Sequence, residues 1–329
     1  MTTDQLSEVL DLVEVRGLLT GGLAATGRWV SRASVQDPLK FFAMVSGSAR
    51  LTTDGVGDPV ELEPGDVAIV NNRSWLEIEG GTGDDPPRVI VPEEADPQTG
   101  LAGADRQTDD VVIGVRVDLN QAGRTLLLQA LPPVAHVRAS AAAASSLRTS
   151  LDRLFDEATG DRVGSAFAIR QHGQLLLLEV LRAYVDQAEL PPGWLRALTD
   201  ERLRPALTLM HKEPGKPWGL QELARAAAMS RTSFTERFRT VVGMPPVTYL
   251  NRWRMLLAQR ALRDGDVRVG SLASDLGYAS ESAFSTAFKR EVGVSPLRYR
   301  YRVREEQGNV VVASAATDTP ETLIYQALS

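Results

Sequence analysis

The spacing of apolar and polar positions changes once along the chain. From Arg28 to about Leu128 the apolar residues form short runs or alternate with polar ones, and turn residues separate the runs. Such short, punctuated segments predict β-strands. Around Ala139 the spacing becomes helical, and after a break at 191–193 it stays helical to about Arg304. The pattern therefore predicts an α+β protein of two domains, strand-rich first and all-helical second.

The strand-rich part is predicted to form a small barrel or sandwich. Tight turns such as Asp54-Gly55 and Pro64-Gly65-Asp66 separate its strands, and many short strands joined in this way favour such architectures. We expect residues 1–27 to be a helical or partly ordered arm and residues 80–103 to be a long loop. The expected strands cover 39–45, 48–52, 66–70, 111–117 and 125–130.

Two amphipathic helices are predicted after the strands. Leu147, Leu151, Leu154 and Phe155 lie at positions i, i+4, i+7 and i+8, which is the spacing of one apolar helix face. A second stripe runs through 168–185. We expect one helix to seal the barrel and the other to pair with a second copy of the chain, which makes the protein a homodimer. The candidate dimerisation residues are Leu175, Leu178 and Leu181.

The helical C-terminal part contains an internal repeat with an offset of 50 residues. Each copy has the pattern of a helix, a turn, a second helix, a Gly turn and a further helix that begins with Pro. Two such units favour a paired helix-turn-helix that binds duplex DNA. A protein-binding solenoid is the alternative, but solenoids usually need at least three repeats. The identical pairs are Ser230/Ser280, Phe234/Phe284, Phe238/Phe288, Gly243/Gly293, Pro246/Pro296, Tyr249/Tyr299, Arg252/Arg302 and Arg254/Arg304.

Each copy places polar residues on the outer face of its second helix. Ser230 and Ser280 are suitable N-cap residues, and the two phenylalanines of each helix must face the core. The residues around them project outward, where a recognition helix reaches base edges in the major groove. Residues 246–263 are predicted to form one helix that holds the two units at a fixed separation. The candidate DNA-binding residues are Arg231, Thr232, Thr235, Glu236, Arg239, Glu281, Ser282, Ser285, Thr286, Lys289 and Arg290.

The charge is unevenly distributed, although the whole chain carries a net charge of −6. Residues 196–304 hold 20 basic and 10 acidic side chains, whereas residues 1–195 hold 16 basic and 28 acidic ones. A basic block on an acidic protein suits a nucleic-acid-binding module, with a solvated basic surface as the alternative. Because the sequence has no cysteine, disulfides and Cys-ligated metals are excluded. No membrane span or signal peptide is expected, so we expect a cytoplasmic protein.

The repeat resembles the AraC/XylS family of bacterial transcription regulators. The first copy matches through Trp218, Leu220, Leu223-Ala224, Met229-Ser230, Phe234, Arg237-Phe238, Gly243, Pro246 and Tyr249, and the second through Val269, Leu272-Ala273, Gly277-Tyr278, Ser280, Ser282, Phe284, Phe288-Lys289-Arg290, Gly293, Ser295-Pro296 and Tyr299-Arg300. The resemblance implies a seven-helix domain with two helix-turn-helix units, usually a transcription activator that contacts RNA polymerase. Small residues and Glu236 replace larger residues of better-known members in the first helix, so the target sequence does not carry over. Glu236 either contacts a cytosine N4 or pairs with a neighbouring Arg.

The N-terminal half resembles the cupin-like sensor domain that often accompanies this module. The matching features are Val45-x-Gly47-x-Ala49, the Pro64-Gly65-Asp66-Val67 turn and Leu131-Pro132-Pro133-Val134. Cupin enzymes hold a metal with His and Glu, but the first histidine here, His136, follows the predicted barrel, so no metal or other cofactor is expected. Alternating acidic residues from Glu61 to Glu79 are expected on a solvated sheet face. The candidate effector-binding residues are Trp29, Arg32, Phe41, Arg50 and Trp75.

These observations predict a ligand-responsive, DNA-binding transcription regulator, more often an activator, and not an enzyme. We expect a cupin-like β-barrel domain with a helical hairpin over 1–190, which binds a small-molecule effector and dimerises. A linker over 191–196 follows, then the double helix-turn-helix domain over 197–304 and a tail over 305–329. Two alternatives stay open at this point: a metal-dependent cupin enzyme fused to a DNA-binding domain, and an effector-independent DNA-binding protein.

Overall fold

The chain forms two compact units in the computed structural model, which describes residues 5–12, 15–55, 57–91, 99–139, 144–187 and 189–305. One unit is Met1–Arg204 with Arg237–Gly243, and the other is Pro205–Glu236 with Met244–Ser329. The expected tail lies outside the described residues except for Glu305. Within the described ranges, no helix is long and apolar enough to cross a membrane.

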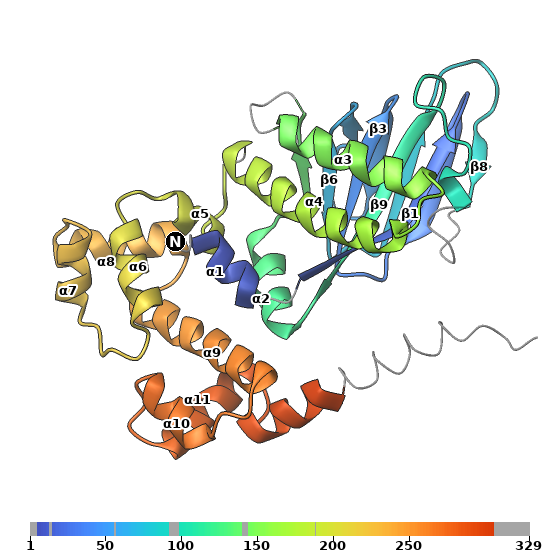
Figure 1. Ribbon diagram of the computed structural model, residues 1–329. Helices are drawn as coiled ribbons and strands as arrows, with labels where there is room; N and C mark the ends of the chain where they lie inside the picture. The colour runs from blue at the N-terminus through green and yellow to red at the C-terminus, as the bar shows by residue number, and fades with distance from the viewer. Residues whose placement is uncertain are drawn as a thin grey trace, which may run out of the picture. The chain divides into compact units, whose positions relative to one another are not determined.

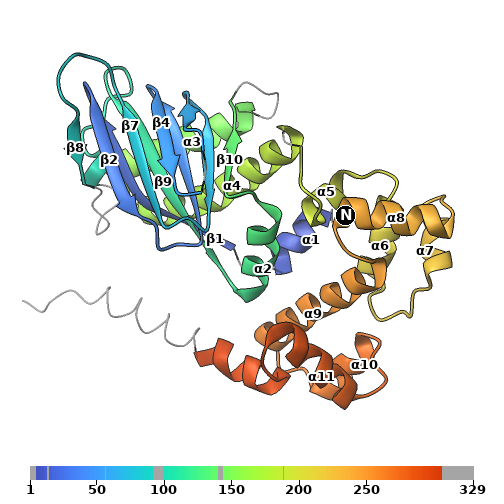
Figure 2. The ribbon, with the colours of Figure 1, turned by 180° about the vertical axis from the view of Figure 1, so that it is seen from behind.

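Two five-stranded sheets form the centre of the first unit. One sheet has the strand order β1-β9-β3-β6-β10 and the other β5-β4-β7-β2-β8; pairing is antiparallel except between β2 and β8. Figure 2 shows the second sheet, with β2, β7 and β4 side by side. The strands are β1 (Val15–Ala25), β2 (Trp29–Ser34), β3 (Leu39–Ser46), β4 (Ala49–Thr53), β5 (Val60–Leu62), β6 (Val67–Asn71), β7 (Trp75–Gly80), β8 (Arg88–Ile90), β9 (Asp110–Leu119) and β10 (Val134–Val137).

The apolar side chains of both sheets meet in one core. Trp29 of β2, Leu51 of β4 and Ile78 of β7 belong to the same buried cluster as Met44 of β3 and Val70 of β6. Because side chains alternate along a strand, the neighbours of these residues point to the opposite faces. The predicted alternating strands therefore enclose a packed interior, as expected for a cupin-like barrel.

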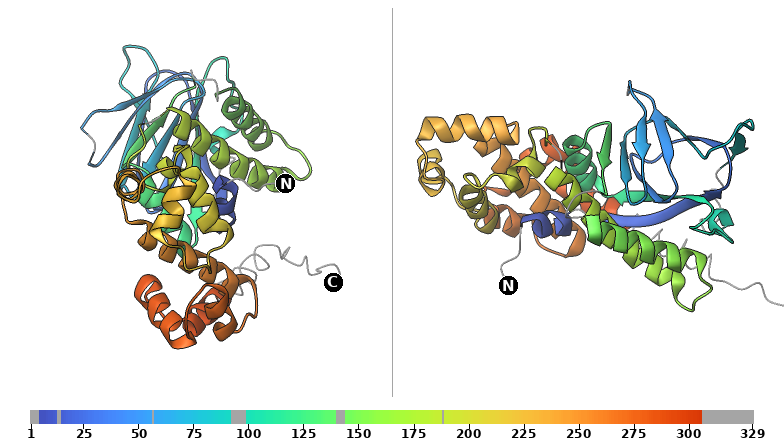
Figure 3. Two further views of the ribbon diagram at one scale, coloured as in Figure 1. Left: turned by 90° about the vertical axis from the view of Figure 1, so that its left-hand side faces the viewer. Right: turned by 90° about the horizontal axis from the view of Figure 1, so that it is seen from above.

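The other face of the first sheet is covered by a helical hairpin. Helices α3 (Ala144–Thr159) and α4 (Ser165–Gln187) lie side by side against it, α4 along β1 and β10 and α3 along β3 (Figures 1 and 3). Leu147, Leu151 and Leu154 are buried, which confirms the predicted stripe of α3. Shorter helices flank the sheets: α1 (Gln5–Leu12), the 3-10 helix η1 (Thr99–Leu101), α2 (Gln121–Ala130) and α5 (Trp194–Thr199).

Three segments differ from the sequence prediction. Residues 15–25 form β1, which pairs along β9, so the expected helical or partly ordered arm is wrong over this segment, although residues 5–12 are helical. The strand is stabilised by partners 85 to 104 residues away in sequence, which local pattern cannot reveal. Residues 125–130 belong to α2 instead of a strand. The Asn120 side chain caps that helix by accepting from Gly123 N at 2.8 Å. The expected loop over 80–103 also contains β8 and η1.

The second unit is helical. Its elements are α6 (Arg204–Lys212), which begins at the end of the first unit, α7 (Leu220–Ala226), the first half of α8 (Arg231–Val242), α9 (Pro246–Asp264), α10 (Val269–Asp275) and α11 (Glu281–Val292). Residues 296–305 are also helical. The predicted single helix over 246–263 is confirmed as α9. Two of these helices, α8 and α11, carry the candidate DNA-binding residues.

Candidate DNA interface

The second helix-turn-helix consists of α10 and α11. Ser280 caps α11, its Oγ accepting from Ala283 N at 3.1 Å, and Gly293 ends the helix in the left-handed region. Phe284 and Phe288 are fully buried and pack with Leu272 of α10 in a cluster that includes residues of α9. The core-facing role predicted for both phenylalanines is confirmed.

The first helix-turn-helix, α7 and α8, is built in the same way. Ser230 caps α8 by accepting from Ser233 N at 3.1 Å, and Phe234 and Phe238 are fully buried. Ala228 in the turn has a φ of 52°, a conformation that costs a residue with a Cβ about 1–2 kcal/mol.

Buried, partly buried and exposed positions follow each other in the same order in the two candidate recognition helices, over residues 231–240 and 281–290. Thr235 and its counterpart Ser285 are partly buried. The remaining predicted DNA-binding residues are exposed: Arg231, Thr232, Glu236, Arg239, Glu281, Ser282, Thr286, Lys289 and Arg290. The structure thus brings each predicted set onto one outer helix face, and their contact with DNA stays a prediction.

Two of these hydroxyls are already engaged as donors. Thr235 Oγ1 donates to the Arg231 carbonyl and Thr286 Oγ1 to the Ser282 carbonyl, both at 2.9 Å. Each oxygen keeps lone pairs free. In this rotamer both threonines act as acceptors, which suits the exocyclic amino groups of adenine and cytosine in the major groove.

Sequence reasoning missed the structural role of a buried arginine of α9, Arg254. Arg254 of α9 is buried and donates to the carbonyls of Pro214, at 2.6 Å, and Lys216, at 3.0 Å. Burial lowers the pKa of Arg254, opposed by the neighbouring Tyr278. The available signal in the sequence is the identity of Arg254 with Arg304 across the repeat. Arg304 instead is exposed and pairs with Asp266.

Close backbone packing accompanies Arg254. A Cβ at Gly277, whose φ is 78°, would overlap the carbonyl oxygen of Gly215, and a Cβ at Gly215 would overlap that of Asp275. The loop between α6 and α7 therefore lies directly against the turn between α10 and α11. Glycine at 277 is required both by its φ and by this contact.

Outside the helical unit, the five predicted effector-binding residues do not share one cavity. Trp29 is buried in the barrel core and donates to Asp110 at 2.7 Å. Phe41 is also buried, but it alternates with Phe42 and Met44 of that core, which places it on the helix-covered face. Arg32 pairs with Glu77, Arg50 pairs with Glu61 and Glu79, and Trp75 is 43% exposed. Of the five, Trp29 and Arg50 line the same cavity, of about 270 Å³.

One acidic residue expected on a solvated face is buried. Asp66 accepts from Ala139 N at 2.7 Å, and its Oδ2 lies 2.8 Å from His136 Nε2. Desolvation acts to raise its pKa, but hydrogen bonds from His136, Ala139 and Glu63 prevail and lower it. His136 belongs to β10, so the expectation that it follows the barrel is wrong. Among the described residues no group of three or more His, Asp or Glu side chains could hold a metal ion.

The predicted dimerisation residues occupy different environments on α4. Leu175 is 49% exposed, Leu178 is half-buried and Leu181 is fully buried. Leu181 is therefore part of the chain's own core, because it lies on the face of α4 that packs on the sheet. Phe167, 62% exposed on the same helix, was not included in the prediction.

Comparisons with known proteins agree with this architecture. A family model described as Cupin matches residues 4–186, and one described as Helix-turn-helix domain matches residues 223–302. An AraC-like transcription regulator of Streptomyces lividans is 35% identical over 300 residues, which cover 90% of this chain and 98% of that protein. The HTH-type transcriptional regulator AlkR of Acinetobacter baylyi is 28% identical over 309 residues, covering 90% of this chain and 99% of that protein.

A solved structure is also similar. The DNA-binding domain of AdpA, a global transcriptional factor crystallised in complex with a target DNA, is 31% identical and covers 33% of this chain and 98% of that one, with a TM-score of 0.32. The relatives that match over most of this chain are named as transcription regulators and not as enzymes. With its cupin domain and helix-turn-helix domain, this chain belongs to the AraC-like family of DNA-binding transcription regulators.

Proposed function

We propose that α8 and α11 are the two recognition helices of this regulator and read successive segments of one DNA site. The observation that carries the proposal is their common burial pattern, with two phenylalanines in the core and polar residues outward. Thr232, Thr235 and Glu236 then contact bases from the first helix, and Ser282, Ser285 and Thr286 from the second. Lys289 and Arg290 contact phosphates and orient the protein without reading sequence.

Selection of binding sites from a random duplex library tests this proposal. With the full-length protein, Thr235→Ala and Ser285→Ala each change base preference at separate positions of the site, by about 1–3 kcal/mol per direct contact. Lys289→Ala weakens binding to all sequences and lowers the salt dependence. Thr52→Ala, on the outer face of β4, is the control and leaves the selected site unchanged. If Thr235→Ala and Ser285→Ala changed the preference at the same base pairs, the two helices would not read separate segments of the site.

We propose that the DNA-binding domain spans 197–304 and that residues 1–190 form the effector-binding and dimerisation domain. The cavity lined by Trp29 and Arg50 is our candidate effector site, and an anionic small molecule would bind its Arg28 and Arg50 by replacing the Glu61 and Glu79 carboxylates that pair with Arg50. Thermal-shift screening with carboxylate and phosphate metabolites tests it: a stabilising compound loses its effect in Arg50→Gln. A compound that stabilises both proteins equally binds elsewhere.

We propose a homodimer formed through α4. The support is two exposed large apolar side chains on one helix, Phe167 and Leu175, since such side chains are typical of an interface when a partner covers them. Phe167→Glu with Leu175→Glu should give a monomer in sedimentation, and its melting temperature should equal that of the wild type diluted until it is monomeric, because neither residue is in the core. Val163→Glu, exposed just before α4, is the matched control. A wild-type monomer at micromolar concentration would exclude the dimer.

In the cell, we propose a cytoplasmic activator that contacts RNA polymerase. In vitro transcription from a promoter that carries the selected site tests the sign of regulation. A rise in transcript with polymerase and this protein alone supports activation, and a fall indicates a repressor.

A further inference from the structure

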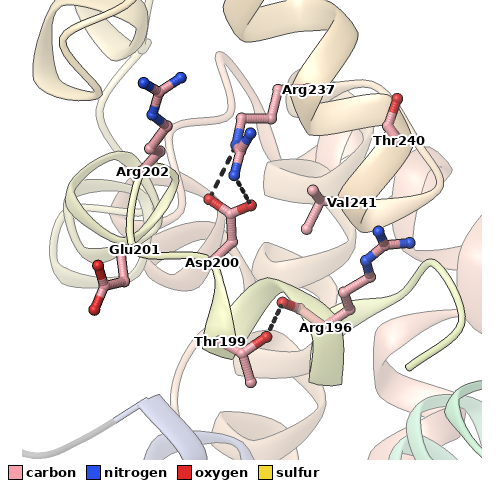
Figure 4. Close-up of a pocket in the computed structure, with 8 residues that line it drawn as sticks. All are labelled: Arg196, Thr199, Asp200, Glu201, Arg202, Arg237, Thr240 and Val241. Atoms are coloured by element: carbon pink, nitrogen blue, oxygen red, sulfur yellow. Dashed lines mark hydrogen bonds and ion pairs between the residues drawn. The ribbon is translucent and has the colours of Figure 1, made fainter. Parts of the chain in front are cut away.

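Arg237 distinguishes the first recognition helix from the second. At the equivalent position of α11 the residue is Ala287, which carries no charge. Arg237 turns away from the outer face of α8 and binds Asp200 with two nitrogens, Nε to Oδ1 at 3.2 Å and Nη2 to Oδ2 at 2.8 Å (Figure 4). Two-point contact between a guanidinium and a carboxylate fixes direction as well as distance.

The Asp200 carboxylate is itself held rigidly. Only 7% of its side chain is exposed, its Oδ1 also accepts from Leu203 N at 2.9 Å, and its carbonyl accepts from Arg204 N at 3.0 Å. Asp200 thus organises the turn between α5 and α6 and binds α8 from that turn. The pair borders a cavity of about 590 Å³ that is open to solvent, which leaves Arg237 38% exposed.

A second contact joins the C-terminal end of α8 to the residue that precedes α5. Gly193 N donates to the Val241 carbonyl at 2.9 Å, immediately before α5 begins. At the start of α5, Trp194 Nε1 donates to the Leu126 carbonyl of α2 at 2.9 Å. The short helix α5 is therefore attached to the cupin domain at its first residue, Trp194, and to the recognition helix on both sides, through Gly193 before it and Asp200 after it.

We propose that Asp200 and Arg237 are positioning residues that set the orientation of α8 on DNA, and that α5 connects this orientation to the cupin domain. The inference rests on the proposed reading of bases by α8. Reading by the first helix then depends on the pair, whereas reading by α11 does not, since that helix has no equivalent arginine.

Binding of the full-length protein to its selected duplex tests the pair. Arg237→Met keeps the apolar stem, and Asp200→Asn keeps an acceptor for Leu203 N. Each should lower affinity about tenfold, and the double variant should lose no more than either single one, because the two residues act through one interaction. With the first half-site scrambled, all three should bind as wild type does. Arg260→Met, which removes the Arg260–Asp264 pair on α9, is the control and should leave binding unchanged.

Three results would overturn the inference: wild-type affinity in both single variants, additive losses, or equal losses with the first half-site intact and scrambled. Thr235→Ala measured in parallel separates this failure from failure of the proposed function, because it changes base preference only if α8 reads DNA. Melting curves set an assay temperature at which each variant is folded. Arg237→Lys, which keeps the charge but loses the two-point geometry, replaces any variant that unfolds, and it should lose affinity at the first half-site alone.

Discussion

The two helix-turn-helix units share their core and differ in their turns and attachments. Buried positions repeat at an offset of 50 in α8 and α11, but at 49 in the preceding helices, where Leu223-Ala224 corresponds to Leu272-Ala273. The second turn is therefore one residue longer, with Ala279 inserted before the cap Ser280. The shared core preserves how each recognition helix is presented, and the inserted Ala279 is exposed, so it extends the turn without entering that core.

The attachments of the two units diverge further. The first recognition helix is fixed by Arg237 to Asp200, whereas the second is joined to α9 by Arg252, which pairs with Glu291 at 3.2 Å. Tyr249 lies with its hydroxyl 2.8 Å from His211 Nε2, while the equivalent Tyr299 packs edge-on against Phe288. Duplication thus kept the apolar framework and replaced the polar contacts, which gives each unit its own sensitivity to mutation and pH.

The largest difference is expected at the turn glycine. Gly277→Ala should lower the free energy of unfolding by about 3 kcal/mol, because it combines a left-handed φ with overlap on the Gly215 carbonyl. Chemical denaturation measures it. Gly219→Ala, where a Cβ would meet nothing within 4 Å, is the control. An equally small effect at both positions would mean that the two loops do not pack as described.

The free energy of unfolding should depend on pH through His211, whose Nε2 lies next to the Tyr249 hydroxyl. Burial lowers the pKa of His211 from 6.5 to about 4, so the folded protein keeps the ring neutral while the unfolded chain binds a proton below pH 6.5. This stabilisation is present above pH 6.5 and is lost as pH falls toward 4, by about 3 kcal/mol in total. His211→Phe, which preserves stacking on Trp253, should flatten the stability curve in that window. Parallel curves for wild type and variant would contradict a neutral, buried His211.

Loss of the buried arginine should destabilise the loop that meets the second turn. Arg254→Met leaves the carbonyls of Pro214 and Lys216 without this donor, at a cost of about 2 kcal/mol. Thermal unfolding checks the value, with Arg252→Met as the comparison, because that half-exposed pair contributes less. A larger loss of stability in Arg252→Met than in Arg254→Met would contradict this expectation.

The smallest expected effect has the opposite sign. Ala228→Gly relieves the φ of 52° in the first turn and should raise stability by about 0.5 kcal/mol, the strain relieved exceeding the added flexibility of the unfolded chain. Differential scanning calorimetry measures the shift, and DNA affinity should not change. A lower melting temperature would show that the Ala228 methyl group has a packing role.

The sequence alone determined the features that depend on local pattern. The repeat, the two pairs of buried phenylalanines, the caps Ser230 and Ser280, and helix α9 all follow from apolar spacing and capping chemistry. These signals repeat within a few residues and do not need a distant partner. The family resemblance rests on the same residues, so the DNA-binding function also follows from the sequence.

Only the tertiary structure decided how charged and ambiguous residues are used. Sequence does not distinguish Asp66, buried against His136, from the solvated Glu61, nor Leu181 in the core from Leu175 on the surface. The positions of Arg237 and Arg254 likewise depend on carbonyls and carboxylates that are close only after folding. Burial and ion pairing arise between segments far apart in the chain, and local periodicity carries no information about them.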